Sequence, residues 1–183
     1  MSLSGVETAL VEYVGDVLVN DLRRPTPDRV LRYHGTLPHD CCTDAGFLVC
    51  SWSSAWGSIS FPSQASTSLA EPCTQFLVPT LALRYVVCWP GLPGTPPAWT
   101  DDYDTEVDGL AAMLADVADG VARALIELSC AVTGHDPYID AVLTASPARL
   151  LRFIDVTPIA PTGGCAGVQW RMYAAPRHGV PVS

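Results

Sequence analysis

The sequence predicts an α+β fold in which an antiparallel β-sheet is packed by an N-terminal helix and a long central helix. Two segments carry apolar residues at helical spacing, strand-like segments follow each of them, and Gly- and Pro-rich stretches separate the segments. The expected order is helix, three strands, helix, two strands (α-β-β-β-α-β-β). With 183 residues, 49% of them hydrophobic, the chain is expected to form a single domain over residues 1–183.

The first expected element is a helix over residues 4–22. Ser4 followed by Glu7 has the spacing of a capping box, in which each side chain bonds the backbone N–H of the other residue. The apolar stripe of this helix consists of Val6, Leu10, Val14, Val17 and Leu18. A Pro-rich link over residues 24–28 ends the helix.

Three strands are expected next. Residues 29–34 alternate weakly, whereas residues 46–60 hold aromatic and β-branched residues between turn signals, with a bulge expected near Gly57. A long loop over residues 61–75 leads to the third strand, residues 76–89. One face of that third strand is expected to carry Leu81, Leu83, Tyr85, Val87 and Trp89. Pro79 lacks an N–H and should lie at an edge or a bend.

The central helix is expected over residues 103–130, after a stiff Pro-rich link over residues 90–100. Its apolar stripe consists of Leu110, Leu114, Val117, Val121, Leu125 and Leu128. Two strands over residues 150–159 and 167–174 should follow as a hairpin, because residues 161–164 supply the glycines of a tight turn. A flexible tail is expected over residues 176–183.

The charge of the chain is strongly negative and concentrated. Ten basic residues, all of them Arg, face 19 acidic ones, so the net charge is −9. Eight acids and one base lie between Asp101 and Glu127. Tight nucleic-acid binding through the phosphates requires the opposite sign. The chain also shows neither a secretory signal at its start nor a run of about 20 apolar residues, so it is expected in a cytoplasm and not in a membrane.

Seven cysteines leave two interpretations open. Buried thiols that pack as small apolar groups are favoured, with a disulfide or thiol cluster among Cys41, Cys42, Cys73 and Cys165 as the alternative. Zinc bound by these cysteines with His34 and His39 is disfavoured, because the chain has none of the short Cys pairs typical of structural zinc sites.

Enzymatic chemistry is the weaker class of function. Cys–His pairs from His39 and Cys41, or from Cys130 and His135, are neighbours in sequence, and catalytic pairs usually converge from separate elements. No nucleophile elbow or phosphate-binding loop occurs, and the absence of Lys excludes every lysine-based mechanism. The carboxylates at 101–108 lack the spacing of a calcium loop, so a solvated helix start is favoured.

The five tryptophans are expected mainly in the core, with interface anchoring as the alternative for any that are exposed. They are Trp52, Trp56, Trp89, Trp99 and Trp170.

A series of short motifs resembles the neck proteins of long-tailed phages that infect actinobacteria. The series comprises Asp40-Cys41-Cys42, Phe47-Leu48-Val49, Phe61-Pro62-Ser63, Cys73, Val87-Cys88-Trp89-Pro90, the acidic Ala-rich helix and Gly163-Gly164-Cys165-Ala166-Gly167-Val168-Gln169-Trp170. It covers about residues 28–175. The absence of Lys suits such hosts.

The resemblance implies a structural virion protein of the head-to-tail connector, assembled in the host cytoplasm. The preferred role is that of a tail terminator, and the alternative is a stopper or adaptor beneath the portal. A tail terminator joins the tail tube to the connector and is expected here as a homohexameric ring that forms part of the DNA channel. Its implied partners are copies of itself, neighbouring neck proteins and the major tail protein, and genomic DNA passes without specific binding. No enzyme activity, cofactor or metal is implied; a Cys/His metal-binding domain or an enzyme is the alternative of another class. The carboxylates expected to face the lumen are those of Asp101, Asp102, Asp104, Glu106 and Asp108.

Overall fold

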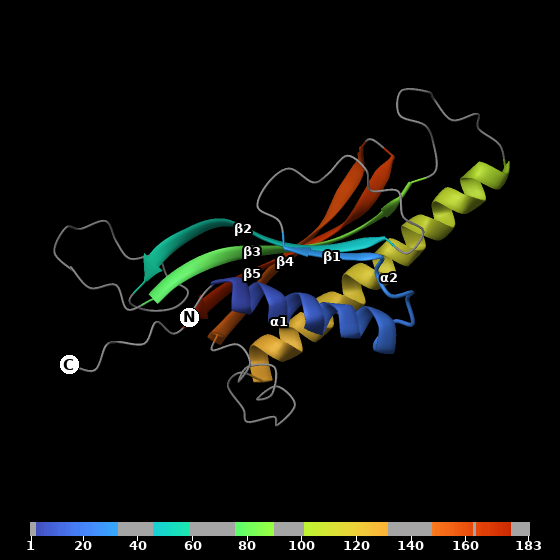
Figure 1. Ribbon diagram of the computed structural model, residues 1–183. Coiled ribbons are helices and arrows are strands. Elements are labelled where there is room, and N and C mark those ends of the chain that lie inside the picture. The colour runs from blue at the N-terminus through green and yellow to red at the C-terminus, as the bar shows by residue number, and fades with distance from the viewer. Residues whose placement is uncertain are drawn as a thin grey trace, which may run out of the picture.

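The computed structural model describes residues 3–32, 46–58, 76–89, 101–131, 148–162 and 164–176. Its helices are α1 (Leu3–Asp16), continued by a π-helical turn η1 (Val17–Asp21), and α2 (Asp101–Ala131). Its strands are β1 (Arg29–Arg32), β2 (Phe47–Ser58), β3 (Phe76–Cys88), β4 (Ala148–Thr162) and β5 (Cys165–Pro176). Both helices lie on one face of the sheet, as Figure 1 shows. The predicted α+β class is therefore confirmed.

The sheet is mixed, which corrects the predicted antiparallel sheet. Within the described residues its order is β1-β2-β3-β5-β4, and β1 pairs with β2 in parallel while the other neighbouring pairs are antiparallel. A parallel pair needs a crossover of about a dozen residues or more, and the stretch between β1 and β2, residues 33–46, meets that requirement. The prediction was wrong because it took these two strands to be closely linked.

Helix α1 begins one residue earlier than predicted, so Ser4 does not occupy the N-cap position that the predicted capping box requires. Ser4 lies inside the first turn, and the Glu7 side chain is buried, with 1% of its surface exposed. The predicted apolar stripe is buried, and its last residues form η1. The Leu22 N–H donates to the Val17 carbonyl oxygen at 3.0 Å, and the helical path ends before the link at 24–28.

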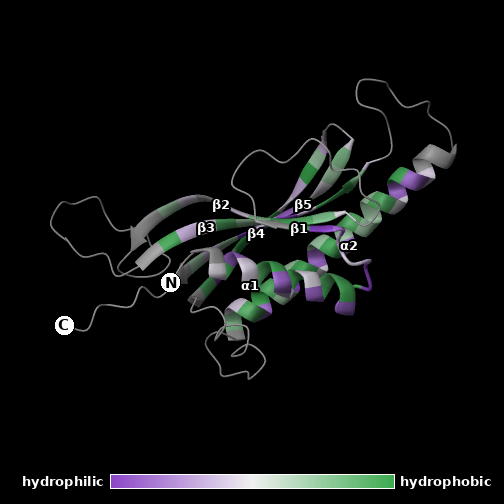
Figure 2. Ribbon diagram, viewed as in Figure 1, coloured by the Kyte–Doolittle hydropathy of each residue, from purple (hydrophilic) through white to green (hydrophobic). Residues whose placement is uncertain are grey.

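The main core lies between the helices and one face of the sheet. Helix α2 contributes the buried side chains of Val117, Val121, Leu125 and Leu128, and the sheet contributes Leu48, Leu81, Leu83, Tyr85, Val168, Trp170 and Met172. Figure 2 shows apolar and polar residues alternating along both helices, as expected of amphipathic helices. A smaller cluster of Phe47, Val49 and Val86 lies apart from this core.

Two hydrogen bonds fix α2 from either side. The fully buried Trp170 of β5 donates its indole N–H to the Ala118 carbonyl oxygen at 3.1 Å, and the Tyr13 hydroxyl of α1 donates to the Ala124 carbonyl oxygen at 3.1 Å. Each bond satisfies a polar group that would otherwise be desolvated without a partner.

The long strands differ from the prediction in detail. The irregularity in β2 lies between Trp52 and Ser54, not near Gly57. Pro79 pairs with Ala55 of β2, but the ladder between β3 and β5 begins only at Thr80, so Pro79 stands at the end of that ladder. Its missing N–H therefore removes no bond to β5.

Strands β4 and β5 form the predicted hairpin. Thr162 pairs with Cys165 across the turn, and Gly164 has a φ of +81°, which favours glycine. Asp155 and Arg171 form an exposed ion pair across the two strands, and hydrogen bonding from Arg171 lowers the pKa of the Asp155 carboxyl. The pair stabilises the hairpin at neutral pH by no more than about 1 kcal/mol, an amount lost as pH falls through that lowered pKa.

We predict that Gly167→Ala destabilises the protein by about 1–3 kcal/mol. A Cβ at Gly167 in β5 would lie 2.2 Å from the Tyr85 carbonyl oxygen, and strand backbone in a paired ladder has little room to move. Gly109→Ala is the matched control, because a Cβ there meets nothing within 4 Å and alanine favours the helix by about 1 kcal/mol. Urea unfolding measures both; a Gly167→Ala protein as stable as the wild type would contradict the prediction.

Candidate functional site

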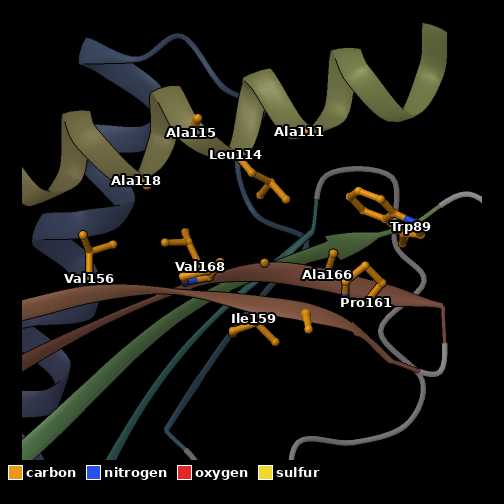
Figure 3. Close-up of a pocket in the computed structure, with 13 residues that line it drawn as sticks. Trp89, Ala111, Leu114, Ala115, Ala118, Val156, Ile159, Pro161, Ala166 and Val168 are labelled. Atoms are coloured by element: carbon orange, nitrogen blue, oxygen red, sulfur yellow. The ribbon is translucent and has the colours of Figure 1, made fainter. Parts of the chain in front are cut away.

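An apolar groove lies between the N-terminal half of α2 and the β4–β5 hairpin (Figure 3), with a volume of about 350 Å³. Its lining residues are Ala111, Leu114, Ala115 and Ala118 of α2; Val156, Pro158, Ile159, Ala160 and Pro161 of β4; Ala166, Gly167 and Val168 of β5; and Trp89. None of these side chains is charged. The Trp89 backbone N–H donates to the Gly164 carbonyl oxygen at 2.7 Å, which ties the end of β3 to the hairpin turn beside the groove.

Small side chains on the helix wall help to form this groove. Ala111, Ala115 and Ala118 recur on one side of α2, at the spacing that places residues on the same helical face. Val117 and Val121, on a neighbouring side of the same helix, are buried in the core. The alanines cannot span the same distance to the hairpin, so the gap between helix and sheet stays unfilled there.

The groove is open to solvent. Ala111 and Ala115 are exposed, and so are Pro158 and Pro161 on the opposite wall. Val156 keeps 38% of its surface exposed, one of the large apolar side chains that remain accessible in the described residues. Apolar side chains on both walls are therefore accessible to a partner.

Carboxylates border the groove on α2. Asp108 precedes Ala111 by three residues and Ala115 by seven, so it continues the groove-lining side of the helix, and it is exposed. Asp119 follows Ala115 by four residues and forms an exposed ion pair with Arg123. The groove is therefore an apolar surface with an acidic rim.

Of the five acids predicted to face the lumen, Glu106 and Asp108 have described side chains, and both are exposed. Asp108 precedes the groove-lining Ala111 by three residues, so it lies on the groove side of α2. Glu106 is two residues from Asp108 and therefore occupies a different side. The side chains of Asp101, Asp102 and Asp104 lie outside the described part of the structure.

The tryptophans fall into three environments. Trp170 is in the core, Trp89 lines the groove, and Trp52 of β2 keeps 42% of its surface exposed. Trp99 and the Trp56 side chain lie outside the described part of the structure.

The cysteines also separate. Cys165 is disulfide-bonded, and its partner lies outside the described residues, as do Cys41, Cys42 and Cys73. Cys50 and Cys130 are reduced thiols. Burial raises the pKa of the Cys50 thiol, and the negative charge of Glu7 raises it further, while Arg84 acts in the opposite direction.

Neither a metal centre nor a membrane span is found in the described residues. No three His, Cys, Asp or Glu side chains among them are grouped to hold a metal ion, and neither described helix is long and apolar enough to cross a membrane. His34, His39 and His135, which belonged to the metal and catalytic alternatives, lie outside the described ranges.

No protein-family model matches the chain, and no curated protein matches its sequence.

Sequence reasoning did not find the groove. The sequence shows the alanine spacing on α2 and the two prolines of β4. It does not show that they lie on facing walls of one groove, because that depends on the distance between the helix and the hairpin. That separation is set by larger side chains elsewhere in the core.

We predict that iodoacetamide modifies Cys130 in the folded protein and leaves Cys50 unmodified. The nucleophile is the thiolate, and Cys50 is fully buried with a raised pKa, whereas Cys130 is exposed. Peptide mass spectrometry with and without urea measures the modification, with Cys50 reacting only after unfolding. Equal rates for the two thiols without urea would contradict this assignment.

Proposed function

We propose that this chain is a structural subunit of a phage neck that assembles with copies of itself into a ring, with tail terminator as the preferred role. The observation that carries the proposed assembly is the solvent-open apolar groove between α2 and the β4–β5 hairpin. The assignment to a phage neck rests on the motif series that spans about residues 28–175.

The groove supports self-assembly for an energetic reason. Covering apolar surface is favourable by about 25 cal/mol per Å². The groove is lined by 13 residues, fewer than the roughly 20–30 residues on each side of a stable interface, so it would form the centre of a wider contact. Identical subunits associated head to tail close into a ring when the rotation between neighbours is suitable.

The charge of α2 supports a passage for DNA. Glu106, Asp108 and Asp116 are exposed carboxylates, and Arg123 is the sole base from 101 to 131. A channel lined with carboxylates repels the phosphates of a duplex and does not retain it. In this proposal, acids of α2 that a neighbouring subunit does not cover face the passage.

Two other functions are kept as alternatives. A stopper or adaptor beneath the portal would use the same groove and charge. A Cys/His metal-binding domain or an enzyme would draw on cysteines and histidines outside the described residues. Zinc in stoichiometric amount in the purified protein, measured by elemental analysis, would favour the metal-binding domain.

Two measurements test the proposed function. Native mass spectrometry of the purified protein is expected to give a closed assembly, six copies for a terminator, and the protein is expected in purified virions. A protein that remains monomeric at high concentration and is absent from virions would overturn the proposal.

We predict that Ala115→Arg prevents assembly without unfolding the subunit. The arginine would place a charge and a long side chain in the groove, whereas Ala115 is exposed and contributes little to the core. Ala112→Arg is the matched control, because Ala112 is an exposed alanine of the same helix that does not line the groove. Sedimentation velocity measures assembly and urea unfolding checks the fold. Equal assembly of the two variants would contradict a role for the groove.

A further inference from the structure

We propose that the groove receives the β1 edge of a neighbouring copy, with Val30 entering the groove and Arg29 lying against the acidic rim at Asp108. This inference rests on the proposed self-assembly and names the surfaces that meet.

Strand β1 is an edge strand with an exposed apolar side chain. β1 is the first strand of the sheet order and pairs with β2 alone among the described strands. Val30 keeps 52% of its surface exposed, the largest value among the exposed large apolar side chains described. Arg29 beside it is also exposed, and so is Arg23 in the preceding segment. The edge thus presents an apolar side chain next to the exposed base Arg29, with the exposed acid Asp28 on the other side of that base.

The charges of the two surfaces are complementary. Residues 21–32 hold four Arg and two Asp, in a chain that has only ten bases. α2 holds eight acids and one base, with Asp108 at the border of the groove. A contact between α2 and an acidic surface of a neighbour would be repulsive, whereas Arg29 offers Asp108 the opposite charge.

The topology makes this contact head to tail. β1 and β4 are the two ends of the sheet order, so β1 and the groove lie at opposite edges of one subunit. Each copy would therefore use its β1 edge on one neighbour and its groove on the other. Such a heterologous contact builds rings and not two-fold dimers.

The contact is made by side chains and does not extend the sheet. Pro158 and Pro161 lie in the half of β4 that borders the groove, and neither has an N–H to donate to an added strand. The pairing of β4 with β5 also shifts register between Ile159 and Thr162. Both features are typical of edge strands that do not accept another strand.

Charge reversal tests the assignment in the full-length protein. Asp108→Arg alone and Arg29→Glu alone are each expected to weaken self-association about tenfold at low salt, and the double variant to recover most of the loss. Glu106→Arg is the control: it changes the net charge as Asp108→Arg does, from another side of α2, and is expected to leave association unweakened. Sedimentation velocity gives the association constants, and urea unfolding confirms that each variant is folded.

The outcomes separate the inference from the proposed function. If Ala115→Arg abolishes assembly but neither Asp108→Arg nor Arg29→Glu affects it, another surface fills the groove. If Trp52→Ala alone also abolishes assembly, that surface is β2. Either result overturns the inference and leaves self-assembly standing. A wild-type monomer at all concentrations overturns both. If the Ala115→Arg protein assembles normally but no longer binds an apolar dye that the wild type binds, the groove is a small-molecule site. That result also overturns the inference.

Discussion

The packing of α2 across one face of the sheet is the interaction on which the rest of the structure depends. Trp170 of β5 is fully buried beneath the helix and donates its indole N–H to the Ala118 carbonyl oxygen. Val121, Leu125 and Leu128 are buried on the C-terminal side of that bond. Since α1 packs on the same face of the sheet and bonds to α2 through Tyr13, the position of α2 fixes both layers.

The same helix changes role along its length. Val117, Val121, Leu125 and Leu128 are buried in the core, whereas Ala111 and Ala115 are small, exposed and line the groove. A core that is closed at one end of the helix and open at the other leaves apolar surface in solvent, which costs free energy until a partner covers it. The groove therefore follows from the residues that anchor the helix, and the proposed assembly would complete a surface that the single subunit leaves uncovered.

The two ends of the sheet differ in chemistry. The β1 end presents the exposed Arg29 next to Val30, and the β4 end lies beside the acidic helix and carries Pro158 and Pro161. A subunit with unlike edges has a direction, and direction is the property that a head-to-tail ring needs. The prolines also protect the β4 edge from uncontrolled strand addition, so that association there relies on side-chain complementarity.

The sequence by itself determined the helices, the strands and the hairpin of this protein, but not how they pack together. Helical spacing predicted both helices to within a few residues, alternation predicted the inward face of β3 from Leu81 to Val87, and paired glycines predicted the hairpin, because each signal lies within one segment. The parallel pairing of β1 with β2 and the burial of Glu7 required the fold, since they depend on which segments become neighbours. The groove, too, could be found only from the tertiary structure. Its alanines and prolines were readable in the chain, but the space between them exists only because larger side chains hold α2 at its distance from the hairpin.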